Sequence, residues 1–351
     1  MLKFLKLTII ILSSIVLIAF LYFHISNNLF LESKNQTIIN YLSKNKIELK
    51  NNVIDSTLFD CDFYNSKVFL LGEVHGFADN QIIDKELFLF LNKKLGIRYY
   101  IAEMDSITSK KLNQYLDNPI KKDQALLKEV VKAIGYRVPQ QSSRELFDKW
   151  SFIYDYNKKL GDSSKIKVLG IDKNFDDATT TIKRDAAMMM NFKNYISKLK
   201  LQNEKFYGLF GVFHTLQSEI ASGPQPFATQ LKEVAIKTTT FVSYPIDSAM
   251  FLPKNPNYPS PPDEKLAWMN ADGPLMLVKG INDLKELSVP YNTTLFKING
   301  AKSPYYKSKN LISVKSRAFA EKIEPTKGTN TTDYFQYVFL IRNSKALSAL
   351  K

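Results

Sequence analysis

The sequence predicts an α/β fold in which helices flank a mostly parallel central sheet. The apolar run at 68–71 is typical of a strand that is buried on both faces of a sheet. Between Asn80 and Leu95 the apolar residues recur at helical spacing, and residues 98–102 predict a second strand. A strand, a helix and a strand in this order predict a β-α-β unit with parallel strands and a right-handed crossover.

The rest of the chain extends this pattern. Residues 106–160 carry three successive helical patterns with no strand between them, which predicts a helical insertion that covers one end of the sheet. Residues 182–199 predict one more helix. Prolines in the segment 253–262 predict an irregular loop, which serves either as a tether or as a lid. Further strands are expected at 165–171, 206–213, 238–244, 294–298 and 334–341.

The first 24 residues predict a signal anchor, that is, an uncleaved transmembrane helix. Lys3 and Lys6 precede an uncharged stretch at 7–23, and no typical cleavage site follows it. The lysines favour a cytoplasmic N-terminus, so the bulk of the chain is expected outside the cytoplasm, at the periplasmic or cell-surface side. The alternative is a cleaved signal peptide. Residues 25–65 are then a linker with a short helix, and 66–351 form the α/β domain.

Composition excludes two classes of site. The net charge is +14, but the lysines are spread along the chain without a basic block or a nucleic-acid motif, so no nucleic-acid partner is expected. Cys61 is the only cysteine, which excludes an intrachain disulfide and a zinc site built from cysteines.

Polar side chains follow four of the predicted strands. Glu73 and His75 come after the first strand, Glu103 after the second, Asp172 after the third and His214 after the fourth. In an open parallel sheet, ligands bind beyond the carboxyl ends of the strands. We therefore expect these side chains to converge on one functional site.

Arg184 is the cation expected at this edge. It lies in the first turn of the helix after the third strand, where a positive charge opposes the helix dipole. Such local conflicts are more common at functional sites. We expect Arg184, together with Asp172, to bind substrate; the structural alternative is a salt bridge from Arg184 to Asp172 or Glu103. Asp185 suits the dipole and needs no further role.

Five motifs occur in a fixed order, at 72–76 (Gly-Glu-Val-His-Gly), 102–104, 170–172, 184–188 and at the strand ending in His214. Together they resemble the erythromycin esterase-like group, whose wider relatives include the ChaN haem-binding proteins and the Tiki/TraB proteins. The resemblance implies an α/β fold with its site at the carboxyl edge and, in the esterase branch, hydrolysis by water with Glu, His and Arg assisting. The esterases typically have Glu-x-x-His in the first motif and two histidines in the later one; this chain has Glu73-x-His75 and His214 alone.

The leading hypothesis is a hydrolase of an ester or related acyl bond, acting on a small-molecule or peptide substrate. His75 is expected to be the general base, oriented by Glu73 or Glu103. His214 and Arg184 are expected to stabilise the developing oxyanion. The chain has no Gly-x-Ser-x-Gly motif, which favours direct attack by water.

Two alternatives use the same residues. In the first, Glu73, His75, Glu103 and His214 hold a divalent metal such as zinc or manganese, for hydrolysis of the Tiki type. In the second, the protein is not an enzyme and binds haem or iron, as a ChaN-type protein does. The sequence therefore leaves the cofactor open between none and a divalent metal.

Overall fold

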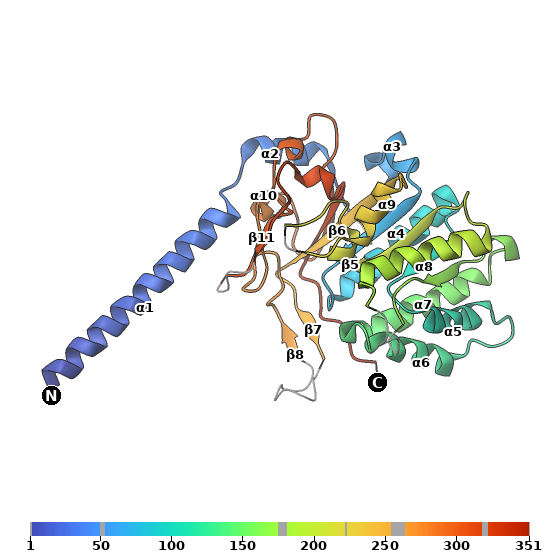
Figure 1. Ribbon diagram of the computed structural model, residues 1–351, viewed down its shortest axis with the longest axis horizontal. Coiled ribbons are helices and arrows are strands. Elements are labelled where there is room, and N and C mark those ends of the chain that lie inside the picture. Colours follow the sequence, from blue (N-terminus) through green and yellow to red (C-terminus); the bar gives the residue numbers. More distant parts are fainter. Residues whose placement is uncertain are drawn as a thin grey trace.

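The computed structural model describes residues 2–49, 53–174, 181–221, 223–253, 264–317 and 322–350. Its centre is an eight-stranded sheet in the order β1-β10-β13-β6-β2-β5-β3-β4. The strands from β13 to β4 run parallel, whereas β10 is antiparallel to both β13 and β1. Helices cover both faces (Figure 1), so the prediction of an α/β fold with a mostly parallel sheet is confirmed.

The eight strands of this sheet are β1 (Lys46–Glu48), β2 (Val68–Glu73), β3 (Tyr99–Ala102), β4 (Lys167–Gly170), β5 (Phe206–Gly211), β6 (Thr238–Ile246), β10 (Thr293–Lys297) and β13 (Tyr337–Arg342). Two small sheets accompany it. One has the order β12-β11-β9 and the other pairs β7 with β8. Their strands are β7 (Met250–Leu252), β8 (Glu264–Leu266), β9 (Leu277–Val278), β11 (Val314–Lys315) and β12 (Lys322–Ile323).

The predicted helices are present, including the helical insertion between β3 and β4, which consists of α5, α6 and α7, whereas α3 and α10 were not predicted. The bounds are α1 (Leu2–Leu31), α2 (Gln36–Lys44), α3 (Cys61–Tyr64), α4 (Ala78–Leu95), α5 (Ser106–Asp117), α6 (Gln124–Gly135), α7 (Arg144–Asn157), α8 (Arg184–Leu199), α9 (Phe227–Glu233) and α10 (Ile281–Glu286).

Strand β2 is buried on both faces, as its continuous apolar run predicts. Side chains alternate along a strand, so Phe69 and Leu71 join the core formed with α4, α5, α6 and α7. Val68 and Leu70 point the other way and pack with side chains from α8 and α9. Two helical layers therefore enclose the strand from which the first motif emerges.

Three segments differ most from the prediction. The strand expected at 206–213 ends at Gly211, because Val212–Thr215 form a 3-10 helix, η5. The last strand begins at Tyr337, because the preceding Thr331–Asp333 form a 3-10 turn held by a capping box from Asn330. The segment 25–65 is more than a linker: α1 continues to Leu31, and β1 adds a strand to the main sheet by pairing with β10. The predicted loop at 253–262 lies, apart from Pro253, outside the described residues.

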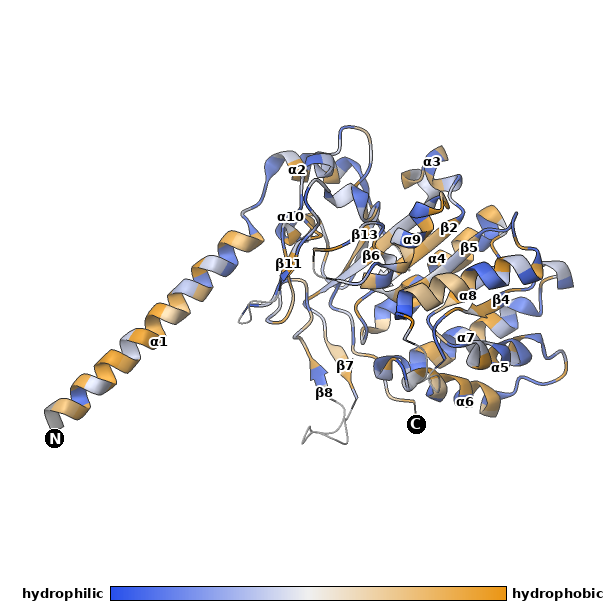
Figure 2. Cartoon of the chain, viewed as in Figure 1, coloured by the Kyte–Doolittle hydropathy of each residue, from blue (hydrophilic) through white to orange (hydrophobic). Residues whose placement is uncertain are grey.

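The N-terminal helix α1 extends away from the α/β domain (Figure 1) and is apolar along most of its length (Figure 2). Its segment Phe4–Leu31 contains an 18-residue stretch with a mean hydropathy of 2.6 and is long enough to cross a membrane. A signal sequence has the same properties. At its base, Lys315 of β11 contacts Ser26 and the ring of Phe30, so the end of α1 is held against the small sheet.

Candidate functional site

The strand order places the predicted polar residues in a row along the carboxyl edge of the sheet. Strand β5 lies between β2 and β3, and β4 follows β3. Glu73 ends β2, Gly211 ends β5, Glu103 follows β3 directly and Asp172 follows β4. Because these strands are parallel, all four ends meet at one edge, where ligands of open α/β sheets bind.

Glu73 and His75 form a hydrogen-bonded pair at the end of β2. Nδ1 of His75 lies 2.8 Å from Oε1 of Glu73, and the Glu73 side chain is almost fully buried. Gln141, which precedes α7, donates a second hydrogen bond of 2.6 Å to the same oxygen. Gly76 then turns the chain with a φ of 104°, a conformation that glycine tolerates best.

The pair sets the protonation state of His75. Burial lowers the pKa of its imidazole, but the hydrogen bond and negative charge of Glu73, together with the charge of Glu103, outweigh burial and raise the pKa above its ordinary 6.5. With Nδ1–H donated to the carboxylate, Nε2 is the nitrogen that carries the free electron pair. His75 is therefore oriented as a base whose cationic form is stabilised.

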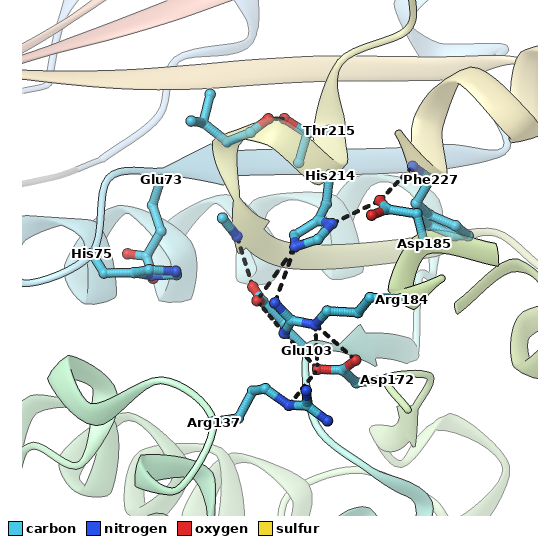
Figure 3. A network of polar contacts seen from close by, with 12 residues as sticks. Glu73, His75, Glu103, Arg137, Asp172, Arg184, Asp185, His214, Thr215 and Phe227 are labelled. Carbon is cyan, nitrogen blue, oxygen red and sulfur yellow. Dashed lines mark hydrogen bonds and ion pairs between the residues drawn. The ribbon is translucent and has the colours of Figure 1, made fainter. Parts of the chain in front are cut away.

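Arg184 joins two buried carboxylates beside this pair (Figure 3). Its Nε donates to Asp172 at 3.0 Å, and its Nη2 donates to both Asp172 and Glu103, at 2.5 and 2.6 Å. Burial raises the pKa of Glu103, but the positive charges of His75, His214 and Arg184 dominate and hold it below 4.5. The two carboxylates raise the pKa of Arg184 further above its already high value despite burial. The predicted salt bridge of Arg184 is present to both acids.

His214 occupies the other side of the Arg184 guanidinium. Its Nδ1 lies 2.7 Å from Oδ1 of Asp185, an oxygen that also accepts the backbone N–H of Phe227. Its Nε2 lies 3.3 Å from Nη1 of Arg184 and 3.7 Å from Oε1 of Glu103. Both ring nitrogens of His214 therefore have partners, Nδ1 at Asp185 and Nε2 at Arg184 and Glu103, and these neighbours hold the ring in position.

Gly211 is the point at which the two groups of residues meet. Its N–H donates to Oε2 of Glu103 at 2.7 Å. A Cβ atom at this position would lie 3.2 Å from Nε2 of His75 and 3.7 Å from Cδ2 of His214. The structure thus brings Glu73, His75, Glu103 and His214 together around one glycine.

Four members of the site were not predicted from the sequence: Gln141, Gly211, Asp185 and Arg137. Arg137 lies with its Nε 3.6 Å from Oδ2 of Asp172. Asp185 was expected to serve only the helix dipole, but it also orients His214. Gln141 and Arg137 belong to the helical insertion and give no local signal. Gly211 gives such a signal, because a glycine at the end of a strand indicates that another group packs closely against the backbone there.

A pocket of about 390 Å³ opens beside His75. Glu73 and His75 line it together with largely apolar side chains from η5, from β6 and β7, from the segment between β8 and β9, and from β11 and β12. Its volume lies within the roughly 300–1,000 Å³ of small-molecule sites. The described residues contain no group of three or more His, Cys, Asp or Glu side chains that could hold a metal ion.

No protein-family model and no curated protein matches this chain in sequence. Solved structures match it in fold. A Bacillus cereus protein whose name states no activity superposes with a TM-score of 0.64 at 12% identity, covering 91% of this chain and 100% of its own. A succinoglycan biosynthesis protein superposes with a TM-score of 0.61 at 14% identity, with coverage of 91% and 100%. The erythromycin esterase EreC, in its open conformation, gives 0.51 at 11% identity, with coverage of 84% and 96%. The predicted resemblance is therefore confirmed at the level of architecture: this chain shares its fold with these structures, an erythromycin esterase among them.

Proposed function

We propose that this protein is a hydrolase of an ester or related acyl bond. The observation that carries the proposal is the Glu73–His75 pair, in which Nδ1 is bound to the buried carboxylate and the ring lines a pocket of small-molecule size. A catalytic base needs an oriented ring with its second nitrogen accessible, and this pair supplies both. The fold shared with an erythromycin esterase agrees with a hydrolase.

In the proposed reaction, water attacks the acyl carbon and its proton passes to Nε2 of His75. Glu73 holds the resulting imidazolium through Nδ1–H, and the charge of Glu103 stabilises it as well. The tetrahedral intermediate then breaks its bond to the leaving group, which takes the proton back from His75. The carboxylate of Glu73 stays charged throughout and orients the ring.

Arg184 and His214 are the proposed partners of the developing oxyanion. Among the described residues, Nη1 of Arg184 contacts the ring of His214, whereas Nε and Nη2 bind carboxylates. Nη1 is therefore the nitrogen best able to donate to a new negative charge. Asp172 keeps the guanidinium in position, which makes its proposed role indirect.

The metal-dependent alternative lacks a ligand set in the described residues. Arg184 further weakens it, because its guanidinium already neutralises Asp172 and Glu103, and a cation would have to compete for those oxygens. The proposed reaction therefore relies on the side chains of the site alone.

We also propose that α1 anchors the protein in a membrane with the α/β domain outside the cytoplasm. Support comes from the length and hydropathy of Phe4–Leu31 and from the lysines near the N-terminus. The proposed partners are the membrane, through α1, and a small-molecule or peptide substrate. No nucleic-acid partner is proposed.

The test uses the purified full chain in detergent with p-nitrophenyl acetate as the substrate. His75→Ala should lower kcat by about 10²–10⁴-fold, the range for a lost acid–base group. His24→Ala, which removes the histidine on α1, is the matched control and should leave kcat unchanged. A chelator should have no effect. If the wild type hydrolyses no ester or peptide but develops a Soret band on addition of haem, the protein is an iron-handling protein and not a hydrolase.

A further inference from the structure

The pocket beside His75 is apolar except where it meets the Glu73–His75 pair. The polar side chains in its lining are those of Glu73, His75 and Gln140, and Tyr244 adds one hydroxyl group on an aromatic ring. Gln140 directly precedes Gln141, which binds Glu73, so the three lie together. The remaining lining includes Leu216, Tyr244, Met250, Met269, Met276 and Ile312.

This lining selects against polar ligands. A sugar or a peptide backbone in the pocket would lose its hydrogen bonds to water without finding partners, which costs several kcal/mol in the worst case. The hydroxyl of Tyr244 offers no help, since it donates to the backbone carbonyl of Leu311. The methionines have flexible, polarizable side chains that adapt to a chain of variable shape. The pocket therefore fits an apolar chain that carries one polar group at the His75 end.

The wall of the pocket is also the sheet on which α1 rests. Val314 of β11 and Ile323 of β12 are paired and both line the pocket. Lys315, the next residue of β11, contacts Ser26 and the ring of Phe30 in α1. Because neighbouring residues of a strand point to opposite faces, α1 lies on one face of this small sheet and the pocket on the other.

The rim of the pocket is apolar and open to solvent. The side chains of Phe213 and Leu275 line the pocket and are nevertheless 49% and 39% exposed. Exposed apolar residues that continue into a pocket mark a path by which an apolar group can enter. Leu275 directly precedes the β9 segment of the small sheet that holds the base of α1, which suits entry of a ligand from a membrane surface.

We infer that the pocket binds the hydrocarbon chain of an amphiphilic ester and presents its ester carbonyl to His75. The inference rests on the proposed function, because it specifies the substrate class of that same site. The volume of about 390 Å³ is close to the lower limit of roughly 300 Å³ for small-molecule sites, which suits a single hydrocarbon chain.

The test separates binding from turnover. The full chain is held in amphipol, which leaves no bilayer into which a probe could partition, and is titrated with cis-parinaric acid, whose fluorescence rises in an apolar site. Leu275→Trp should fill the mouth of the pocket and weaken binding by roughly tenfold or more, a difference of about 1.4 kcal/mol for each factor of ten. Phe213→Glu places a charge at the rim and should act in the same direction without overfilling the pocket.

The matched control is Met190→Trp, the same enlargement on the exposed face of α8 and outside the pocket, which should bind the probe as the wild type does. In the same preparations, the ratio of kcat/KM for p-nitrophenyl decanoate to that for the acetate should fall in Leu275→Trp and stay unchanged in Met190→Trp. Turnover of the acetate without any binding of the probe overturns the inference and leaves the hydrolase intact. Binding of the probe without turnover of either ester overturns the hydrolase and leaves the chain site standing.

Discussion

His75 has a raised pKa because its ring is paired with Glu73 and lies near Glu103. Burial lowers the pKa of His75, and Glu73 is the main group that opposes this effect. Glu73→Gln should therefore lower the pKa of His75 toward or below 6.5. The rate of ester hydrolysis should rise with pH through the pKa of His75, because the neutral ring is the base, so this limb should move to lower pH in Glu73→Gln. NMR titration of the chain, which has only three histidines, measures the pKa directly.

The contribution of His75 to the stability of the fold should change with pH in the direction opposite to that of the rate. Since the folded protein favours the cationic ring, the contribution of His75 to stability is fully present below its unfolded pKa of about 6.5 and is lost as the pH rises through its folded pKa. His24→Ala, a change at an exposed histidine of α1, should leave the titration of His75 in place. A wild-type pKa of His75 at or below 6.5 would contradict the assigned pairing with Glu73.

Arg184 is the cation that keeps two buried acids charged. Arg184→Ala leaves Asp172 and Glu103 without their main counter-ion, and the loss of one partner from a buried pair costs about 3–5 kcal/mol. Arg144→Ala is the matched control, because Arg144 pairs with Asp148 on the exposed surface of α7, where such a pair contributes about 0.3–0.5 kcal/mol. Urea unfolding of both variants measures the difference. Equal free energies of unfolding would mean that Arg184 is not the counter-ion of these acids.

At the scale of elements, the junction between β5 and η5 controls the spacing of the two histidines. Gly211→Ala would place a methyl group 3.2 Å from Nε2 of His75, closer than a comfortable contact. The ring would have to shift, and misplacement of a base by about 1 Å can cost as much as 10²-fold in rate. We therefore expect a marked loss of kcat on p-nitrophenyl acetate with the fold retained.

Gly161→Ala supplies the control for this change. Gly161 has a φ of −65°, and a Cβ atom there would meet no other atom within 4 Å, so alanine should be tolerated. Circular dichroism and urea unfolding establish that both variants are folded. Full activity in Gly211→Ala would mean that His75 does not need its present position.

At the scale of the whole molecule, the proposed anchor fixes which side of the membrane the site faces. Cys61 is the only cysteine of the chain and its side chain is exposed, so an impermeant maleimide reports the location of the α/β domain without any engineered residue. Cys61 should react in intact spheroplasts, and the protein should remain in the membrane pellet after carbonate extraction.

Two variants control this labelling. Cys61→Ser should abolish it, and Leu2→Cys in the Cys61→Ser background should react only after lysis, because the N-terminus is expected in the cytoplasm. Labelling of Cys61 only in lysed cells would reverse the proposed orientation. A soluble protein that begins after residue 23 would instead identify a cleaved signal peptide.

What the sequence by itself determined is local. The apolar run before Glu73 predicts a strand buried on two faces, and helical spacing after it predicts α4, because period and burial are encoded in neighbouring residues. Parallel strands also bring their carboxyl ends to one edge, so the convergence of Glu103 and His214 with Glu73 could be anticipated. The strand boundaries near Gly211 and Tyr337 could not, since 3-10 turns replace the ends of apolar runs there.

Only the tertiary structure decided the arrangement of these residues. The insertion of β5 between β2 and β3 places Gly211 between the two histidines, and no local pattern encodes the order of strands in a sheet. Gln141 reaches Glu73 from the helical insertion 68 residues away in the chain, so its role depends on how that insertion packs. The pocket likewise combines segments from β2 to β12, because a cavity is defined by the side chains that surround it and not by any one of them.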